Sequence, residues 1–330
     1  MTWDLIGHEW AVQLLQGHIE NNTLRHAYLI TGPSGIGKKN LAVRFIQAIC
    51  CPNPRDPGIP CLECPTCIRL QRLEHPDLFP ITVEKGSKQI KIDQVRELVR
   101  TLSLSPYEAS RRFGLLIDFE LANRHTQNSL LKTLEEPPGS VILILTAVSA
   151  GSLFKTVSSR CEEVKLNPVP IQTTRQGLEN LYQIPEDQAD FLAHISAGKP
   201  ELALAYYQDP EILERRNTLL DQHYEILKGD SVARFAYANQ LVKDPDMVQE
   251  MLDTWSSIWH DILMQVGKSD TPIRNIDREW EIKSIISSVD LREAKSAVNL
   301  FRRAHSLLQK NSNLKLTVED LFLRLPTIPG

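Results

Sequence analysis

The first half of the chain alternates between short apolar runs and amphipathic stretches. Three runs of strand length are almost entirely apolar: AYLIT at 27–31, FGLLID at 113–118 and VILILT at 141–146. Continuous apolar runs of this length are typical of strands buried on both faces of a parallel sheet. Weaker strand candidates lie at 78–83 and 162–166. Helical patterns separate the runs, so the sequence predicts an α/β layered domain.

One of these helical patterns has a clear end. The segment TQNSLLKTLEE at 126–136 has helical periodicity and is followed directly by Pro137 and Pro138. Proline removes a backbone donor and clashes with the preceding turn of a helix. The pattern therefore predicts one helix over 126–136 that stops before the two prolines.

After about residue 167 only helical patterns remain. The segment NPVPIQ indicates a linker, and no convincing strand follows it. Gly198 and the pair Asp209-Pro210 separate a short helical bundle from a longer helical region. The sequence therefore predicts three domains, an α/β domain at 1–167 and all-helical domains at 168–209 and 210–330.

Composition narrows the class of protein. The 330 residues carry 37 basic and 41 acidic side chains, a net charge of −4, which argues against a protein that coats nucleic acid electrostatically. No segment approaches the roughly 18 to 20 consecutive apolar residues of a membrane span. The opening MTWDLIGHEW lacks the apolar core of a secretory signal. We therefore expect a cytoplasmic protein without a membrane partner.

The turn GPSGIGKKN, directly after the first predicted strand, nearly matches a phosphate-binding loop. That motif is glycine, four residues, glycine and lysine, followed by serine or threonine. A strand before the turn and a helical pattern after it are the context in which backbone N–H groups surround phosphate oxygens. The candidate nucleotide-binding residues of the turn are Gly32, Gly35, Gly37 and Lys38.

Two departures argue against ATP hydrolysis. Lys39 stands where a hydroxyl would coordinate Mg²⁺, and an ammonium group cannot coordinate a cation. Asp118 ends a buried strand at the position of a Walker B aspartate, but Phe119 follows where hydrolysing proteins carry a glutamate. Glu120 is one residue further, and a continuing strand would point it to the opposite side. We expect no intrinsic ATPase activity, while ATP binding by Lys38 stays open.

The segment CCPNPRDPGIPCLECPTC indicates a structural zinc site. Cys61, Cys64 and Cys67 are spaced two residues apart, and Cys51 or Cys50 lies about ten residues upstream. Four thiolates suit tetrahedral zinc, and the prolines between them disfavour regular structure, so the metal would order the loop. Cys51 is the preferred fourth ligand because Cys50 ends the preceding helical pattern. Disulfides are the less favoured alternative in a reducing compartment.

Several longer segments together resemble one family. They are WDLIGHEWAVQLLQGHI, HAYLITGPSGIGK, the run from HPDLFPITVEKG to SRRFGLLID, NSLLKTLEEPPGSVILILTA and TVSSRC. These segments cover most of residues 1–167 and resemble the bacterial clamp-loader AAA+ subunits, whose cysteine module the segment 50–67 also resembles. The resemblance implies an AAA+ domain with a RecA-like parallel sheet and an inserted zinc module. An all-α lid at 168–209 and an all-α C-terminal collar at 210–330 would follow.

The resemblance also implies roles for individual residues. Arg160 in Ser-Arg-Cys matches an arginine finger that acts in trans, at the nucleotide of a neighbouring subunit. A guanidinium group there stabilises charge on the transferred phosphoryl oxygens. Thr146 matches the sensor 1 position, although a polar residue that simply closes a strand is an equal alternative. Glu201 stands where the motor subunit of this family carries a nucleotide-contacting arginine.

The resemblance further implies partners and leaves two alternatives. The partners are the gamma/tau motor and delta subunits, with the sliding clamp and primer-template DNA reached through the assembly. The departures at Lys39, Phe119 and Glu201 favour a non-hydrolysing member of the family. One alternative is an ATP-hydrolysing gamma/tau-type motor, which Lys39 and Phe119 disfavour. The other is a zinc-dependent nucleic-acid-binding module, which the acidic net charge disfavours.

Overall fold

The computed structural model of the chain describes residues 3–84, 86–309 and 312–329. They form two compact units. The N-terminal unit reaches to Ile184 and includes Gly198–Leu202, and the C-terminal unit consists of Pro185–Ala197 and the residues from Ala203 on. The sequence predicted three domains, with boundaries at 167/168 and 209/210. This division into three stays a prediction.

A five-stranded parallel sheet organises the N-terminal unit, with strand order β2-β3-β4-β1-β5. The strands are β1 Ala27–Thr31, β2 Leu78–Ile81, β3 Arg112–Leu116, β4 Val141–Ala147 and β5 Glu162–Lys165. All five predicted strands are therefore confirmed, and the fold is an AAA+ domain with a RecA-like parallel sheet. Because β1 lies between β4 and β5, the glycine turn after it lies at an inner strand of the sheet.

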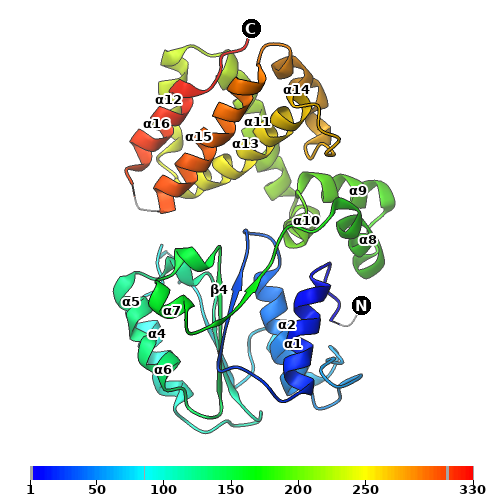
Figure 1. Ribbon diagram of the computed structural model, residues 1–330, viewed down its shortest axis with the longest axis vertical. Coiled ribbons are helices and arrows are strands. Elements are labelled where there is room, and N and C mark those ends of the chain that lie inside the picture. The colour runs from blue at the N-terminus through cyan, green and yellow to red at the C-terminus, as the bar shows by residue number, and fades with distance from the viewer. Residues whose placement is uncertain (1–2, 85, 310–311, 330) are drawn as a thin grey trace. The chain divides into compact units, whose positions relative to one another are not determined.

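Helices cover both faces of this sheet (Figure 1). One face carries α1 Glu9–Glu20 and α2 Lys38–Cys50, and the other carries α4 Ile92–Leu102, α5 Arg124–Ser129, α6 Leu131–Glu135 and α7 Lys155–Ser158. Alternate residues of one strand serve the two cores: Tyr28 and Ile30 pack with α1 and α2, whereas Leu29 packs with the opposite layer. A strand that contributes to both cores has to be apolar throughout, which explains the continuous runs.

The predicted helix at 126–136 is divided in two, so that prediction was wrong in detail. α5 starts earlier because the Asn123 side chain caps it, accepting a hydrogen bond from the Thr126 N–H at 3.1 Å. The Ser129 hydroxyl donates to the Thr126 carbonyl at 2.7 Å, which competes with the regular helix ladder, and the helix ends there. α6 follows after Leu130 and ends at Glu135, ahead of the prolines as expected.

The remaining elements are helical, and for the chain after residue 167 the sequence predicted only helices. α3 Pro65–Gln71 lies in the N-terminal unit, as does α8 Ile171–Tyr182. The other helices are α9 Glu186–Ile195, α10 Pro200–Gln208, α11 Pro210–Lys228, α12 Ser231–Leu241, α13 Pro245–Val266, α14 Glu279–Ile286, α15 Leu291–Gln309 and α16 Leu314–Arg324. Short 3₁₀ segments η1, η2 and η3 lie at Phe119–Leu121, Ala150–Ser152 and Ile276–Arg278.

The C-terminal unit has its own aromatic core. Trp255 and Trp259 are fully buried there, and the Trp255 indole N–H donates to the Leu219 carbonyl at 2.7 Å. The buried guanidinium of Arg234 donates to the carbonyls of Phe322 and Leu325 at 2.8 and 2.7 Å. These carbonyls lie at the C-terminal end of α16, where helix carbonyls otherwise lack partners, so Arg234 joins α12 to α16.

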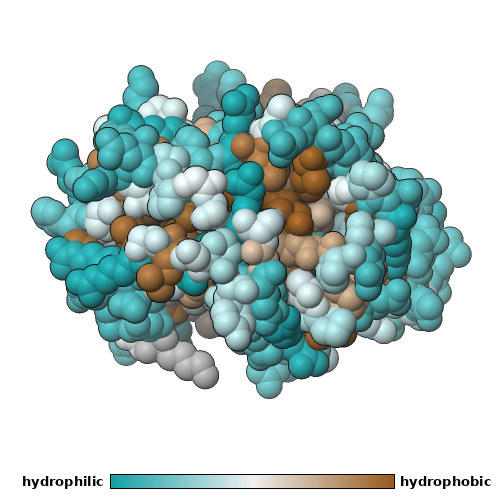
Figure 2. Space-filling model, turned by 90° about the horizontal axis from the view of Figure 1, so that it is seen from below, coloured by the Kyte–Doolittle hydropathy of each residue, from teal (hydrophilic) through white to brown (hydrophobic). Residues whose placement is uncertain are grey.

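The surface is mainly hydrophilic where Figure 2 shows it, with hydrophobic residues gathered in separate patches. Large apolar side chains with high exposure in the N-terminal unit include Leu104 at 60% and Tyr107 at 79%. In the described part of the chain, no helix combines the length and apolar character that crossing a membrane requires.

Candidate nucleotide-type site and metal centre

The glycine turn between β1 and α2 is tightly packed against its own unit. Gly32 and Gly35 have φ angles of +154° and +75°, a region that favours glycine. A Cβ on Gly32 would lie 2.8 Å from the carbonyl oxygen of Leu166, and one on Gly35 would lie 2.8 Å from the Cβ of Leu202. Glycine is therefore required at both positions by the fold of the unit itself.

The lysine of the turn points back to the turn. The Lys38 residue is only 6% exposed, and its ammonium group donates to the carbonyls of Gly32 at 2.9 Å and Pro33 at 3.2 Å. These bonds use two of the three N–H donors that a phosphate-binding lysine would offer to phosphate oxygens.

Asp118 and Thr146 come together at the carboxyl ends of the neighbouring strands β3 and β4. The Thr146 hydroxyl oxygen accepts a hydrogen bond from the Asp118 backbone N–H at 2.8 Å. Both residues thus lie at the carboxyl edge of the parallel sheet, where open α/β sheets generally bind ligands. The hydrogen bond to the Thr146 hydroxyl therefore fixes the backbone at Asp118, just after β3.

The expectation for Glu120 was wrong in its local structure. β3 ends at Leu116, Asp118 adopts a left-handed backbone with φ of 50°, and Phe119 begins the 3₁₀ helix η1. Glu120 therefore does not lie on a strand, and its carboxylate accepts a hydrogen bond from the Val148 N–H at 3.2 Å. Phe119 is fully buried. Burial raises the pKa of the neighbouring Glu120 carboxyl, which also interacts with the charges of Asp118 and Lys38.

Glu201 lies against the glycine turn. The Leu202 N–H, one residue further on, donates to the Gly35 carbonyl at 3.1 Å and places this segment on the turn. Burial raises the pKa of the Glu201 carboxyl, whereas Lys39, Lys38 and a hydrogen bond from the Gly37 N–H oppose that shift. The sequence had indicated only that Glu201 replaces an arginine, because nothing in its pattern signals a contact with a turn more than 160 residues away.

Arg160 lies in the turn between α7 and β5. Its guanidinium donates to the Thr156 carbonyl at 2.8 Å and pairs with a Glu135 carboxylate oxygen at 2.7 Å. The side chain remains 36% exposed. An arginine that is held near a helix end yet reaches solvent can contact a group on another molecule.

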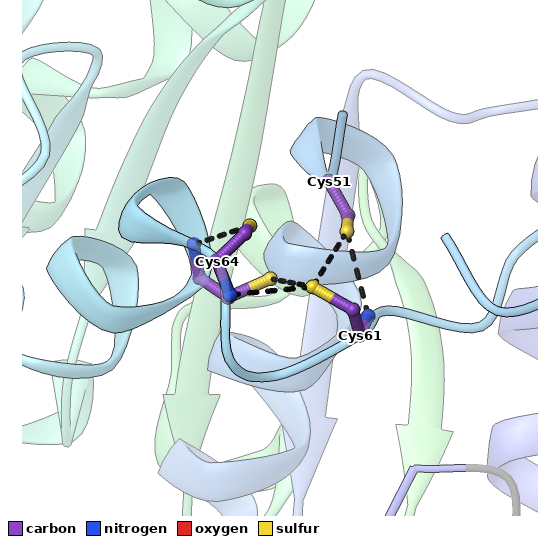
Figure 3. A group of neighbouring side chains, drawn as sticks. Cys51, Cys61 and Cys64 are labelled. Atoms are coloured by element: carbon purple, nitrogen blue, oxygen red, sulfur yellow. Dashed lines mark hydrogen bonds between the residues drawn. The ribbon is translucent and has the colours of Figure 1, made fainter. Parts of the chain in front are cut away.

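Four of the predicted thiols form one cluster, and Figure 3 labels three of them, Cys51, Cys61 and Cys64. The Sγ atoms of Cys51, Cys61, Cys64 and Cys67 all lie within 4.8 Å of one another. The Cys51 and Cys61 sulfurs are 3.5 Å apart, and those of Cys61 and Cys67 are 4.0 Å apart. A zinc ion with Zn–S bonds of about 2.3 Å has sulfur–sulfur edges of about 3.8 Å, so the cluster has the size of a tetrahedral metal site.

Backbone N–H groups donate to three of the four sulfurs of the cluster. The N–H groups of Cys61, Cys64 and Cys67 donate to the sulfurs of Cys51, Cys61 and Cys64, each at 3.4 Å. Burial alone would raise the pKa of Cys61, but hydrogen bonds to its sulfur lower that pKa to about 7. The loop is not irregular throughout, because α3 begins at Pro65 and carries Cys67. The four cysteines could therefore hold a metal ion, and zinc fits them.

Cys50 lies outside the cluster. It is the last residue of α2 and packs, half-buried, against the core that α1 and α2 share with the sheet. Burial raises its pKa to about 12. None of the six cysteines, all of them among the described residues, forms a disulfide.

The sheet order, the glycine turn after β1 and the arginine turn before β5 define a P-loop protein of the AAA+ class. The family model described as "DNA polymerase III, delta subunit" matches residues 7–170. The chain belongs to this DNA polymerase III subunit family.

Relatives named delta' and gamma both match. DNA polymerase III subunit delta' of Pseudomonas aeruginosa is 33% identical over 63% of the chain and 63% of the relative. The delta' subunit of Bacillus subtilis is 27% identical over 95% of the chain and 94% of the relative. DNA polymerase III subunit gamma of Buchnera aphidicola is 28% identical over 98% of the chain and 94% of the relative. The match thus spans under two thirds of the Pseudomonas relative but nearly all of the other two.

Proposed function

We propose that this chain acts as a delta prime-type, non-hydrolysing subunit of the DNA polymerase III clamp loader. Its partners would be the gamma/tau motor and delta subunits, and it would reach the sliding clamp and primer-template DNA through their assembly. The family match and the relatives named delta' support this proposal. The helical C-terminal unit would join the collar of the assembly, and the lid would comprise 168–209.

The observation that carries the proposal is the placement of Arg160. Its guanidinium is partly exposed and is held by Glu135 and the Thr156 carbonyl at the end of a short helix. Such a group can approach the nucleotide of a neighbouring motor subunit and stabilise charge on the transferred phosphoryl group. Arginine fingers contribute about 10³- to 10⁵-fold to turnover in other nucleotide hydrolases.

Two positions of the chain's own site carry residues other than those that a hydrolysing site uses. Lys39 replaces the Mg²⁺-binding hydroxyl, and Phe119 is buried where a glutamate would orient water. The Lys38 ammonium is bonded to the turn itself. These features support a subunit that assists turnover elsewhere and performs none.

The cysteine cluster would hold a structural zinc ion through Cys51, Cys61, Cys64 and Cys67. Bound zinc would supply cross-links among these four thiolates. The chain itself provides the N–H donors to the sulfurs and a bond from the Gln47 side chain to the Cys67 carbonyl at 2.7 Å. All four ligand positions are taken by protein, which supports a structural role and not a catalytic one.

The test is DNA-stimulated ATP turnover by the clamp loader reconstituted from this chain and its motor and delta subunits. Arg160→Ala should lower turnover by about tenfold or more, because the charge-stabilising guanidinium is lost. Lys38→Ala should leave turnover unchanged. Arg96→Ala, which removes an arginine with a 58% exposed side chain from α4, is the matched control.

The same assay distinguishes the proposed role from the alternative of an ATP-hydrolysing gamma/tau-type motor. The similarity to the gamma relative is the reason to test this alternative. Damage from Lys38→Ala with little effect of Arg160→Ala would mean that the chain's own site hydrolyses ATP. That result would replace the non-hydrolysing role with a motor role.

A further inference from the structure

One face of α15 carries an unbroken band of positive and polar side chains. Its four cations recur at helical spacing and are all exposed: Arg292, Lys295, Arg302 and Arg303. Ser296 and Asn299 lie between them and are exposed as well. At about 100° per residue these side chains fall within an arc of about 120°, which contains no acidic residue of the helix. This face is termed the basic stripe, and the opposite face packs into the core through Phe301.

The cations of the basic stripe are not neutralised within the described chain. In residues 3–84, 86–309 and 312–329, none of the four forms an ion pair. Asp320 of α16 lines a small hollow together with Arg303, but it pairs with Arg324 at 2.7 Å. The acidic residue of α15 itself, Glu293, lies beside the arc, and its carboxylate accepts a hydrogen bond from the Asp290 N–H at 2.9 Å.

The length and the chemistry of the basic stripe match a row of phosphates. From Arg292 to Arg303 the helix extends about 16 Å, at about 1.5 Å per residue. Duplex DNA carries one phosphate charge per about 1.7 Å of its axis, so this length of duplex presents several phosphates to the stripe. Hydroxyl and amide groups, such as those of Ser296 and Asn299, are further donors to phosphate oxygens.

The stripe has no exposed aromatic side chain on which bases could stack. Phe301, the phenylalanine of α15, is fully buried. Proteins that hold single strands combine a positive groove with exposed aromatic residues, whereas contacts to the phosphate backbone alone suit a duplex of any sequence. We propose that the basic stripe of α15 binds the phosphate backbone of duplex DNA directly.

This inference goes beyond the proposed function, in which the chain reaches DNA only through its assembly. It assigns a direct contact to one helix of the C-terminal unit. The net charge of −4 does not oppose it. At physiological salt, exposed charges more than about 8 Å apart are largely screened, so the local charge of the stripe counts for more than the total charge of the chain.

The experiment measures binding of a fluorescein-labelled DNA duplex of about 20 base pairs to the full chain by fluorescence anisotropy, between about 25 and 200 mM NaCl. The stripe variant combines Arg292→Gln, Lys295→Gln, Arg302→Gln and Arg303→Gln, because glutamine removes the charge and is a good helix former. At the lowest salt this variant should bind at least about tenfold more weakly than wild type. The slope of log K against log salt should become less steep by about 3 to 4, since each phosphate contact contributes about 0.9.

The matched control removes four positive charges from exposed positions elsewhere in the C-terminal unit, by Arg215→Gln, Lys243→Gln, Lys268→Gln and Lys283→Gln. It should bind the duplex about as tightly as wild type. Two double variants, Arg292→Gln with Lys295→Gln and Arg302→Gln with Arg303→Gln, should each lose part of the affinity, so the test does not depend on the folding of one variant.

Three results would overturn the proposal. One is a wild type that does not bind the duplex at the lowest salt, and another is an equal loss of affinity in the stripe variant and the control. The third is a stripe variant that binds the duplex normally but no longer joins the reconstituted clamp loader. That result would mean that an acidic protein surface is the partner of the stripe.

The two proposals fail separately. The duplex-binding assay uses neither ATP nor a motor subunit, so a negative result there leaves the role of Arg160 to the turnover assay. A chain without an effect of Arg160→Ala can still hold duplex DNA through α15, which the anisotropy measurement reports.

Discussion

Single buried side chains fix the local backbone that the site depends on, and Asp77 is the clearest case. Its side chain is fully buried, and its two carboxylate oxygens accept hydrogen bonds from the N–H groups of Tyr107, Glu108 and Ala109 at 2.7, 2.7 and 2.8 Å. One carboxylate thereby orders the loop that leads into β3. Because β3 ends just before Asp118, this loop helps to set the position of the candidate site.

We expect Asp77→Asn to destabilise the chain by about 2 to 3 kcal/mol, because an amide can no longer accept all three backbone N–H groups. The urea midpoint followed by circular dichroism measures the change. Asp93→Asn, at an 86% exposed side chain on α4, should change the midpoint little. Equal effects of the two variants would contradict a role for the buried carboxylate.

The same contact makes stability depend on pH. Burial alone would raise the pKa of Asp77, but the three N–H bonds lower it below its ordinary value of 3.8. A carboxyl with a lowered folded pKa stabilises the protein fully above the unfolded pKa, and this contribution is lost as the pH falls through the folded pKa. In unfolding curves recorded between about pH 5 and pH 2, Asp77→Asn should therefore lose less stability than wild type.

At this scale the sequence predicted some site residues and missed others. Gly32, Lys38 and the four cysteines follow spacing rules that physical chemistry imposes locally, so their grouping could be predicted. The contact of the segment that carries Glu201 with the turn could not, because it joins residues far apart in the chain. The Lys38 bonds to its own turn were equally unpredictable, since the motif alone does not say where the side chain points.

Among the structural elements, the cysteine module of residues 51–67 offers the sharpest test. The sequence left Cys50 and Cys51 as alternative fourth ligands, and the structure places only the Cys51 sulfur with the other three. Cys51→Ser should therefore lose zinc, which metal analysis of the purified chain would report against one zinc per wild-type chain. It should also unfold at a lower temperature, because the thiolate cross-link is lost.

Cys50→Ser is the neighbouring control and should retain zinc, because Cys50 belongs to the core beside α2. Retention of zinc by Cys51→Ser together with its loss from Cys50→Ser would reverse the assignment. Zinc-free wild type would leave the cluster without its proposed metal.

The positions of strands and helices could be predicted where the pattern of apolar residues alone determines them. The three inner strands β1, β3 and β4 could be predicted because burial on both faces demands nearly uninterrupted apolar residues. The division between α5 and α6 could not, because it depends on where the Ser129 hydroxyl bonds. The end of β3 was also missed, since the left-handed Asp118 has no sequence signal of its own.

For the molecule as a whole, the C-terminal helices have an apolar core that is complete within residues 219–328. We expect a fragment of residues 209–330 to fold alone and to melt cooperatively. Asp209 is included because its carboxylate caps α11 through the Glu211 N–H at 3.1 Å. Thermal unfolding followed by near-ultraviolet circular dichroism tests this, because Trp255 and Trp259 are fully buried.

Two tryptophan variants make the fragment experiment specific. Trp255→Phe should remove much of the near-ultraviolet signal, whereas Trp280→Phe should remove little, because Trp280 is 60% exposed. A gradual transition without a near-ultraviolet signal would mean that this unit needs the rest of the chain.

The close packing of Gly32 and Gly35 affects how long these glycines are retained during evolution. Both positions exclude a side chain whether or not a nucleotide is ever present. Mutations there would be removed by selection for folding alone, even after selection for ATP binding has ended. The glycines of a phosphate-loop motif can therefore persist in a protein that no longer binds a nucleotide, because the fold still requires them.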